Sequence, residues 1–300
     1  MVTTGDELAG RVVAVTGGGS GIGEALSRHL AARGAAAVAV IDINDDAAQA
    51  TAARLAGAGS AYCADLSVES EVDRVINAVT SAHGPIDVWC SNAGILAIGG
   101  AEVPTDQWQR TWDVNVMAHV WAARTLVPQM IARGGGQFLI TASAAGLLTQ
   151  IGSAPYSVSK HAAVAFGEWL SITHGDQGID VTLLCPQAVA TAMTAGIPGG
   201  GVAGVDGMLG PDDVAAVAVE GLLARQFYVL PHPEVATYAQ RRVTDPERWL
   251  AGMRRLQARF APPGGTGNTG GPGNTGAPGN TGGPGNTGNE ARPTDHPDRP

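Results

Sequence analysis

The sequence predicts an α/β fold, in which a doubly wound parallel sheet carries helices on both faces. Short apolar runs alternate with stretches of helical periodicity along most of the chain, and strands separated by helices pair in parallel. Polar residues follow several of the apolar runs, at the strand ends where ligands bind in such sheets. The 300 residues are 44% hydrophobic, which suits one large domain with a sizeable core.

Each expected strand is a short apolar run bounded by turn residues. We assign strands to residues 11–16, 36–41, 60–63, 86–90, 137–141, 180–185 and 227–230. The expected helices repeat apolar residues three and four positions apart. The first helix runs from the first glycine-rich turn to Gly34, and the others cover residues 45–56, 68–82, 105–133, 153–175, 211–225 and 233–260. Thr105 and Ser153 are expected to cap the N-termini of their helices.

A glycine-rich stretch, TGGGSGIG at residues 16–23, joins the first expected strand to the first helix. Glycines allow the backbone to approach a pyrophosphate, and the helix N-terminus points N–H groups at it. The glycine spacing here is GxxxGxG rather than the common GxGxxG. Asp42 ends the second strand 19 residues beyond Gly23, where a carboxylate would accept a hydrogen bond from a ribose 2′-hydroxyl. The βαβ unit therefore predicts a dinucleotide site.

Lys160 is the only lysine of the chain and lies four residues after Tyr156. In a helix these two side chains share one face, with Pro155 in the first turn. An ammonium about 4 Å from a phenol favours the phenolate by roughly 4 kcal/mol at an effective dielectric of ~20, or about three pKa units. We therefore expect a tyrosine pKa lowered towards neutrality, as suits a general acid/base. The alternative is an ordinary surface pair.

Charge and cysteine content restrict the class of protein. The net charge of −9 argues against a general affinity for nucleic acid or anionic membrane. Cys63, Cys90 and Cys185 are far apart and form no CxxC pair, so we expect reduced thiols in a cytoplasmic protein and no metal site. No secretory signal and no apolar run of the ~18–20 residues that span a bilayer is evident.

The regular alternation ends after Pro186. Residues 188–210 are rich in Gly, Ala and Met and are expected to form a lid over the site. From Ala261 a Gly-Asn-Thr-Gly-(Gly/Ala)-Pro unit repeats with period six. Such a stretch buries too little apolar surface to fold alone. We therefore expect a catalytic domain over residues 8–260 and a disordered tail over residues 261–300.

Four motifs occur in order along the chain: residues 16–23, Asn92-Ala93-Gly94, Ser143, and Tyr156-x-x-x-Lys160. Together they resemble the short-chain dehydrogenase/reductase family over roughly residues 8–260. The resemblance implies a single Rossmann-type domain and an NAD-dependent oxidoreductase that interconverts a secondary alcohol and a ketone. It further implies a homo-oligomer, a dimer or tetramer, formed through the helix before Ser143 and the helix of Lys160. Trp121, Ala122 and Trp169 are expected on the outer faces of these helices.

The resemblance also implies roles for individual residues. Tyr156 exchanges a proton with the substrate oxygen, Lys160 lowers the tyrosine pKa and binds the nicotinamide ribose, and Ser143 donates to the substrate oxygen. Asn115 is similar to the family residue that holds a water on a proton path from Lys160. With Tyr156 and Lys160, the implied cofactor-binding residues are Thr16, Gly17, Gly19, Ser20, Gly21, Ile22, Gly23, Asp42, Asp65, Leu66, Asn92, Ala93, Gly94, Pro186, Val189 and Thr191.

The expected substrate pocket is mostly apolar and suits a hydrophobic small molecule. Besides Ser143, its candidate residues are Leu147, Leu148, Gln150, Gln187, Met193 and Ile197. Gln187 stands where the family pattern has a glycine, so the local backbone or the pocket polarity differs from that pattern. The substrate itself is left open by the sequence.

Asp42 predicts NAD rather than NADP, because a carboxylate would repel a 2′-phosphate and the adjacent Ile43 and Asn44 are uncharged. The competing interpretation of Asp42 is a helix cap, for which Asn44 or Asp45 is better placed. The alternative functions are an NADPH-dependent carbonyl or 3-oxoacyl-carrier reductase, a catalytically silent dinucleotide sensor on the same fold, and a scaffold that acts through its repeat tail.

Overall fold

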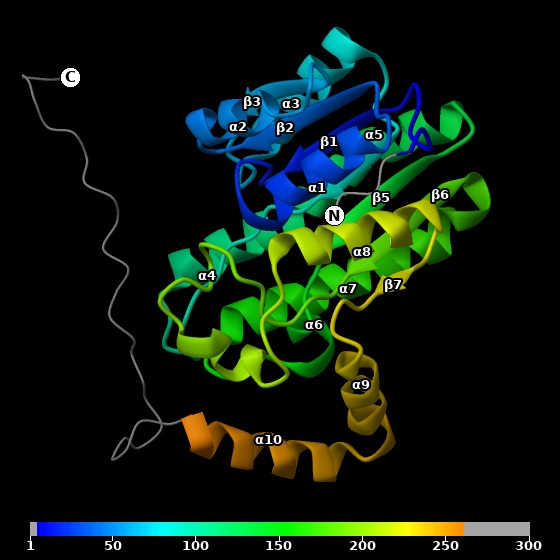
Figure 1. The fold of residues 1–300 in the computed structure, drawn as a ribbon. Helices are drawn as coiled ribbons and strands as arrows, with labels where there is room; N and C mark the ends of the chain where they lie inside the picture. Colours follow the sequence, from blue (N-terminus) through cyan, green and yellow to red (C-terminus); the bar gives the residue numbers. More distant parts are fainter. Residues whose placement is uncertain (1–4, 261–300) are drawn as a thin grey trace, which may run out of the picture. The chain divides into compact units, whose positions relative to one another are not determined.

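The computed structural model describes residues 5–260, so the tail expected over residues 261–300 lies outside the described residues. Within the described range, seven strands form one parallel sheet of order β3-β2-β1-β4-β5-β6-β7 (Figure 1). The order runs outward in both directions from β1 and β4, which confirms the doubly wound topology. The strands are β1 Val12–Thr16, β2 Ala37–Asp42, β3 Gly59–Cys63, β4 Val88–Ser91, β5 Gly136–Thr141, β6 Ile179–Leu184 and β7 Tyr228–Val229.

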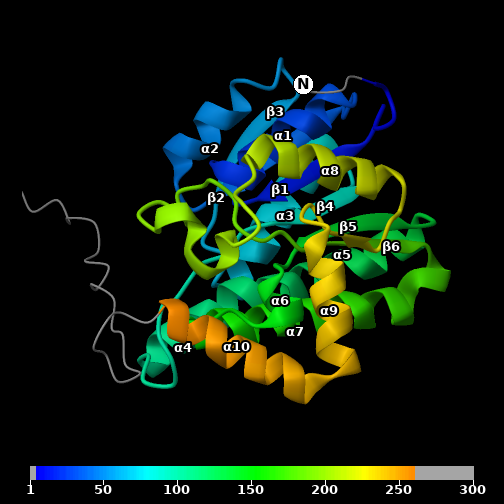
Figure 2. The same ribbon diagram turned by 60° about the horizontal axis from the view of Figure 1, so that its bottom comes forward.

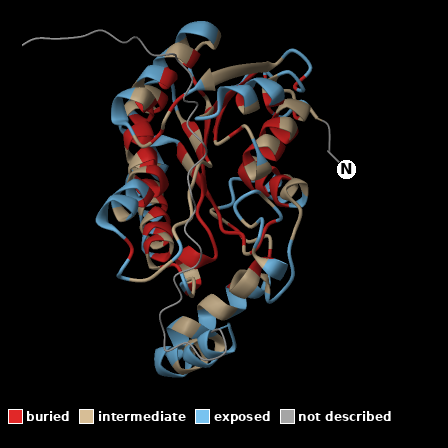
Figure 3. Cartoon of the chain, turned by 90° about the vertical axis from the view of Figure 1, so that its left-hand side faces the viewer, coloured by how far each residue is buried: buried red, intermediate tan, exposed pale blue. Residues whose placement is uncertain are grey.

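Helices cover both faces of this sheet, because side chains alternate between the faces along each strand. Val12 and Ala14 of β1 pack with α3, α5 and α7, whereas Val13 and Val15 pack with α1, α2 and α8 (Figure 3). The α-helices are α1 Gly21–Ala32, α2 Asp45–Ala52, α3 Glu69–His83, α4 Thr105–Trp112, α5 Ala118–Ala132, α6 Ala145–Leu148, α7 Ala154–His174, α8 Pro211–Leu223, α9 Glu234–Thr244 and α10 Pro246–Phe260. None of them combines the length and apolar character needed to cross a bilayer.

The helix expected over residues 105–133 contains a π-helical turn, η1 (Asp113–Met117), between α4 and α5. Single π turns often lie at functional sites, and Asn115 lies within this one. Thr105 is the first helical residue, and Pro104 occupies the cap position without a side-chain cap bond. The assignment of Thr105 as the cap was therefore wrong by one position.

Two other helix ends also differ from expectation. Ser153 occupies the cap position of α7, but its hydroxyl accepts no hydrogen bond from a helix N–H. It donates to the Ala97 carbonyl instead, and so ties the loop after β4 to α7. The helix expected over residues 233–260 breaks at Asp245, because a proline disfavours helical backbone in the residue before it. Asp245 Oδ1 then accepts a hydrogen bond from Arg248 N at 3.0 Å, which caps α10.

The segment expected as a lid, residues 188–210, is largely irregular. It contains a short 3₁₀ segment, η3 (Pro198–Gly204), and a bridge between Val189 and Leu209. A further 3₁₀ turn, η2 (Gly175–Gln177), leads from α7 to β6. The α9–α10 pair follows β7 and extends along the same end of the molecule as α6 (Figure 2). Both the lid segment and this pair contribute walls to the cavities described below.

Candidate active site

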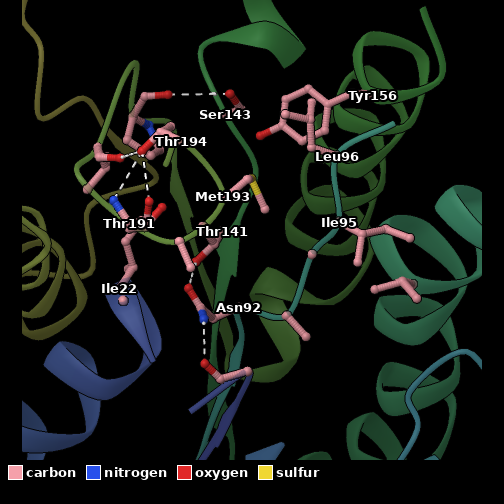
Figure 4. Close-up of a pocket in the computed structure, with 18 of the residues that line it drawn as sticks. Ile22, Asn92, Ile95, Leu96, Thr141, Ser143, Tyr156, Thr191, Met193 and Thr194 are labelled. Atoms are coloured by element: carbon pink, nitrogen blue, oxygen red, sulfur yellow. Dashed lines mark hydrogen bonds between the residues drawn. The ribbon is translucent and has the colours of Figure 1, made fainter. Parts of the chain in front are cut away.

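A cavity of about 440 Å³ opens at the carboxyl ends of the central strands. Its walls come from the glycine loop after β1, the ends of β2 to β6, α7 and the lid segment. At this edge the connections from β1 and β4 leave in opposite directions, which creates the crevice where doubly wound sheets bind ligands. Figure 4 shows Ser143 and Tyr156 at one end of this cavity, with Ile22 and Asn92 towards the other.

The glycine loop takes a backbone shape that side chains would obstruct. Gly17 and Gly21 have φ angles of 61° and 54°, in the left-handed region that favours glycine. A Cβ on Gly23 would lie 2.0 Å from the Gly17 carbonyl oxygen, so α1 approaches the loop more closely than any larger residue allows. The Ser20 side chain does not cap α1, which leaves first-turn N–H groups available to an anion.

Asp42 fastens this loop to the end of β2. Its two carboxylate oxygens accept hydrogen bonds from Gly19 N at 2.9 Å and Asn44 N at 3.0 Å. Asn44 Oδ1 in turn accepts from Ala47 N and caps α2. The cap of α2 is therefore Asn44, one of the two residues that the sequence favoured. The half-buried Asp42 lines the cavity, and its carboxylate can accept further hydrogen bonds.

Asp65 and Arg110 meet at the edge of the cavity near β2 and β3. Asp65 Oδ1 accepts from Ser67 N at 2.9 Å and Ser67 Oγ at 2.7 Å, and Arg110 Nη2 lies 3.8 Å from Oδ2. Burial raises the pKa of Asp65, but the Ser67 hydrogen bonds and the Arg110 charge outweigh it, and the pKa lies below its usual value. Arg110 was not predicted, because a single arginine on an amphipathic helix gives no sequence signal of a site.

Thr16 and Asn92 hold the crevice together. Thr16 Oγ1 donates to Cys90 O at 3.2 Å and accepts from Asn92 N and Ala93 N at 2.8 and 3.0 Å. Asn92 Nδ2 donates to Thr16 O at 3.0 Å. Asn92 Oδ1 accepts from Thr141 Oγ1 at 3.1 Å (Figure 4). The ends of β1, β4 and β5 are thereby fixed to one another.

Lys160 is buried, with 2% of its surface exposed, and its ammonium donates to the Thr141 carbonyl at 2.8 Å. Its Nζ lies 5.7 Å from the centre of the Tyr156 ring. Burial lowers the pKa of Lys160 to about 8. Burial raises the pKa of Tyr156 above its ordinary value, and the neighbouring Ser143 hydroxyl only partly opposes this. The expected lowering of the tyrosine pKa is therefore wrong, because burial of the phenol disfavours the phenolate.

Ser143 stands at the amino end of α6, beside the phenol. Its Oγ donates to Pro186 O at 3.4 Å and accepts from Ala145 N at 3.1 Å. The hydroxyl thus lies between β5, β6 and α7 and faces the same space as Tyr156 (Figure 4). Ser143 and Tyr156 are 13 residues apart in the sequence, and they lie close together because α6 and α7 pack against each other.

Asn115 has a positioning role in this structure. Its Nδ2 donates to Ile95 O and Ser159 Oγ, both at 3.0 Å, and its Oδ1 accepts from Ile95 N at 2.8 Å. Those bonds use both amide hydrogens, so the side chain braces the loop after β4 against α7. The water-holding role expected of Asn115 stays a prediction. Gly94 lies close to both Asn115 and Lys160, since a Cβ at this position would lie 3.3 Å from Asn115 Oδ1 and from Lys160 Nζ.

A buried histidine, His119 on α5, completes the polar network behind Lys160. Its Nδ1 lies 2.6 Å from Ser91 Oγ. Burial, together with the nearby Lys160 charge, lowers the pKa of His119 to about 3, so this imidazole is neutral near pH 7. No sequence pattern distinguishes it from the other six of the seven histidines.

Most predicted site residues line the one cavity. They are Gly17, Ser20, Gly21, Ile22, Asp42, Asp65, Leu66, Asn92, Ala93, Gly94, Ser143, Gln150, Tyr156, Lys160, Pro186, Gln187, Val189, Thr191, Met193 and Ile197. Thr16, Gly19, Gly23 and Asn115 stand behind its wall and shape it. Leu148 lies in a neighbouring cavity, and Leu147 packs against the core instead. Lining residues that were not predicted include Ile43, Ile95, Leu96, Arg110 and Thr141.

The fold and the site together define an α/β protein with a glycine loop suited to a nucleotide. Ser143, Tyr156 and Lys160 lie in the same cavity as this loop. A family model for short chain dehydrogenases matches residues 11–199. The chain is 37% identical to 1-deoxy-11-beta-hydroxypentalenate dehydrogenase of Streptomyces exfoliatus, over 76% of this chain and 85% of that protein. It belongs to the short-chain dehydrogenase family of oxidoreductases.

Solved structures show the same similarity. A short-chain dehydrogenase/reductase of Burkholderia phymatum in complex with NAD has a TM-score of 0.75 and 29% identity, over 81% of this chain and 96% of that one. A 3-ketoacyl-(acyl-carrier-protein) reductase of Brucella melitensis, complexed with NADH, has a TM-score of 0.69 and 26% identity, over 75% and 98% of the two chains. The fold predicted from the sequence is confirmed.

Proposed function

We propose that this protein is an NAD-dependent dehydrogenase that interconverts a secondary alcohol and a ketone on a hydrophobic small molecule. The observation that carries the proposal is the convergence of Ser143, Tyr156 and Lys160 at one end of the cavity that holds the glycine loop and Asp42. Related proteins named as dehydrogenases of hydroxypentalenate and of meso-2,3-butanediol support this reaction class. The test is an assay of NADH formation with a panel of hydrophobic secondary alcohols.

The residues present fit a nicotinamide dinucleotide. Gly17 and Gly21, with the open first turn of α1, would hold the pyrophosphate, and Asp42 and Asp65 would face the adenosine. Val189 and Thr191 line the opposite wall, where the nicotinamide would lie. When bound, NAD supplies the hydride acceptor for the reacting carbon, and the chain's own residues position the substrate and move its proton.

Tyr156 is the proposed acid/base. Its raised pKa keeps the phenol protonated, ready to donate to a ketone oxygen in the reduction direction. In the oxidation direction the phenolate accepts the hydroxyl proton, and the Lys160 ammonium stabilises that phenolate. Ser143 supplies a hydrogen bond to the substrate oxygen as negative charge develops on it.

The sequence prediction of NAD preference is retained within this proposal. Asp42 would accept hydrogen bonds from ribose hydroxyls but repel a 2′-phosphate. We expect kcat/KM with NAD to exceed that with NADP by about tenfold to a hundredfold, or ~1.4–2.7 kcal/mol. Arg110 also lines the cavity but lies beside Asp65, which offsets its charge. Steady-state kinetics with both cofactors provide the measurement.

The variants for this test must respect the bond between Asp42 and Gly19. Ile43→Arg leaves that bond in place, and we expect this substitution to narrow the preference for NAD over NADP. Asp42→Ala combined with Ile43→Arg should narrow the preference for NAD further or reverse it. Asp42→Asn removes the charge at nearly the same size. Its one amide oxygen can accept from only one of Gly19 N and Asn44 N, and we expect this variant to narrow the preference for NAD as well. Equal efficiency with NAD and NADP in the unmodified protein would contradict the role of Asp42 and favour the NADPH-dependent reductase alternative.

We also retain the proposal of a homo-oligomer, with Trp169 from the residues first named and without Trp121 and Ala122. Trp121 and Ala122 pack inward against the core, so they were wrongly placed on an outer face. Trp169 and Ile172 on α7 are 53% and 84% exposed, and a large apolar face of this kind suits an interface.

Light scattering of the full chain is expected to give at least twice the mass of one chain. Ile172→Asp should shift this mass towards that of one chain, because a charge buried at an interface is costly. Val243→Asp is the control, because Val243 is 83% exposed on α9, away from α7. A single-chain mass for the unmodified protein at micromolar concentration would contradict the proposal.

Two further sequence expectations also remain proposals. We propose that residues 8–260 form the catalytic domain and that residues 261–300 are dispensable for turnover. We also propose a cytoplasmic location, which the reduced state expected of the three cysteines supports.

A further inference from the structure

A second cavity, of about 1310 Å³, continues outward from the candidate active site. The two cavities share Ser143, Gln150, Gln187 and Ala203. One side of the second cavity is formed by α6 and the lid segment, and the other by α9 and α10, which Figure 2 shows at the same end of the molecule. A substrate that reaches Ser143 therefore has room to extend beneath α10.

The α9–α10 side of this cavity carries a cluster of arginines. The four that line it are Arg241, Arg248, Arg255 and Arg259. Three of them lie on α10 at spacings of seven and four residues, which places them on one face of that helix. Arg254, their neighbour on α10, is not among the lining residues.

The positive charge of the four arginines is not cancelled locally. Within residues 5–260 none of them forms an ion pair. Two aspartates also line the cavity and have other partners: Asp206 accepts from Tyr238 Oη at 3.0 Å and Gln187 Nε2 at 3.1 Å, and Asp245 caps α10. The cavity thus has two more positive than negative side chains, in a chain of net charge −9.

Apolar side chains supply the rest of this wall. Leu148 of α6 lines the cavity together with four apolar residues of α10: Trp249, Met253, Leu256 and Phe260. Trp249 also packs against the cluster that contains Leu148. Helix α10 has no fully buried residue, so its apolar stripe borders the cavity without being sealed in the core. A wall that combines an apolar surface with unpaired guanidinium groups complements a molecule with a hydrophobic body and an anionic end.

On the basis of the function proposed above, we propose that the substrate is a hydrophobic hydroxy acid. Its carbinol would lie at Ser143 and Tyr156, its apolar body would extend under α10, and its carboxylate would be bound by the arginines of α9 and α10. Guanidinium groups bind carboxylates through paired hydrogen bonds, so the arginines favour the acid over a neutral analogue. They also orient the substrate, with its carboxylate at α9 and α10 and its carbinol end towards Ser143.

The test compares hydroxy fatty acids that carry a secondary alcohol on the penultimate carbon with their methyl esters, over graded chain lengths. With the full-length protein and NAD, we expect kcat/KM for the best acid to exceed that for its ester by about tenfold or more. Raising the ionic strength should reduce this preference, because salt screens charges near the surface.

Arginine variants assign the preference to α10. Arg248→Gln with Arg255→Gln should lower kcat/KM for the acid by about tenfold, mainly through KM, and leave the ester within about twofold. Arg254→Gln is the matched control on the same helix and should change neither substrate. Equal efficiency for acid and ester in the unmodified protein, or an acid preference that survives the double substitution, would overturn the inference and leave the proposed dehydrogenase function intact.

A binding measurement separates this inference from the reaction itself. Calorimetry in the presence of NAD should show decanoate binding more tightly than decanol, with the difference lost in the Arg248→Gln, Arg255→Gln protein. That result supports the anion site even if the protein oxidises no alcohol. In that case the proposed dehydrogenase reaction would be wrong, and the anion site would still stand. Equal binding of decanoate and decanol, or decanoate binding unchanged by the double substitution, would overturn the anion site.

Discussion

Replacing Tyr156 with phenylalanine is expected to lower kcat by roughly 10²–10⁴-fold, the usual contribution of a positioned acid/base. The phenyl ring fills the same space, and only the hydroxyl that faces Ser143 is removed. The glycine loop, Asp42 and Lys160 are untouched, so NAD affinity should stay within about twofold of normal. Single-turnover kinetics and a cofactor titration by calorimetry measure the two effects separately.

Tyr62→Phe is the matched control for this substitution. Tyr62 lies on β3 with its hydroxyl 3.1 Å from His83 Nε2, away from the cavity. We expect its kcat to equal that of the unmodified protein. A Tyr156→Phe protein that keeps near-normal kcat on a good substrate would refute the assignment of Tyr156 as the acid/base.

Replacing Lys160 with methionine is expected to lower kcat strongly and at the same time stabilise the fold. A buried ammonium is unfavourable, and burial lowers the pKa of Lys160 from 10.5 to about 8. At about 1.4 kcal/mol per pKa unit, methionine of similar length should raise the free energy of unfolding by roughly 2 kcal/mol at neutral pH, after allowing for the lost bond to Thr141 O. Loss of the ammonium removes the stabiliser of the Tyr156 phenolate, so kcat should fall by about 10²-fold or more.

The pH dependence of this stabilisation has a defined sign. The folded pKa of Lys160, about 8, lies below the unfolded value of 10.5, so between these values the unfolded state binds more protons. The contribution of this group to the free energy of unfolding therefore rises with pH across that window. Below it, Lys160 is charged in both states and the destabilisation is complete.

Chemical denaturation of both proteins between pH 7 and 10 tests this expectation. The advantage of the Lys160→Met protein should be largest near pH 7 and shrink as the pH rises towards 10. Burial raises the pKa values of Cys90 and Cys185 to about 12, above this pH range. Comparing the two proteins cancels the contribution of Cys90, whereas the pKa of Cys185 also depends on the Lys160 charge, which lowers it. A methionine variant that is less stable than the unmodified protein near pH 7 would contradict the description of Lys160 as an unfavourably buried charge.

The strands and most helices could be predicted from the sequence because their signals are local. Apolar runs such as residues 11–16 are buried strands, and the apolar positions of α3 all lie in the core. The failures arise where tertiary contacts decide the outcome. Ser153 bonds to a distant carbonyl instead of capping α7. Asn115, within the π turn, bonds to Ile95 and Ser159, which are distant in the sequence.

The site shows the same division. The glycine loop, Asn92, Ser143, Tyr156 and Lys160 fall where the motifs indicate, because each motif sits at the end of a strand or the start of a helix. The direction in which the Lys160 ammonium points, the placement of Arg110 beside Asp65, and the arginine-lined cavity under α10 depend on how separate elements pack. No spacing in the sequence encodes those arrangements.

Formation of NADH by the full-length protein, followed with hydrophobic secondary alcohols, tests the proposed function most directly. We predict NADH formation with NAD and at least one such alcohol, much slower formation of NADPH with NADP, and almost none when Tyr156 is replaced by phenylalanine. A protein that binds NAD but oxidises no alcohol and reduces no ketone, or one whose turnover is the same with and without the Tyr156 hydroxyl, would contradict the proposal.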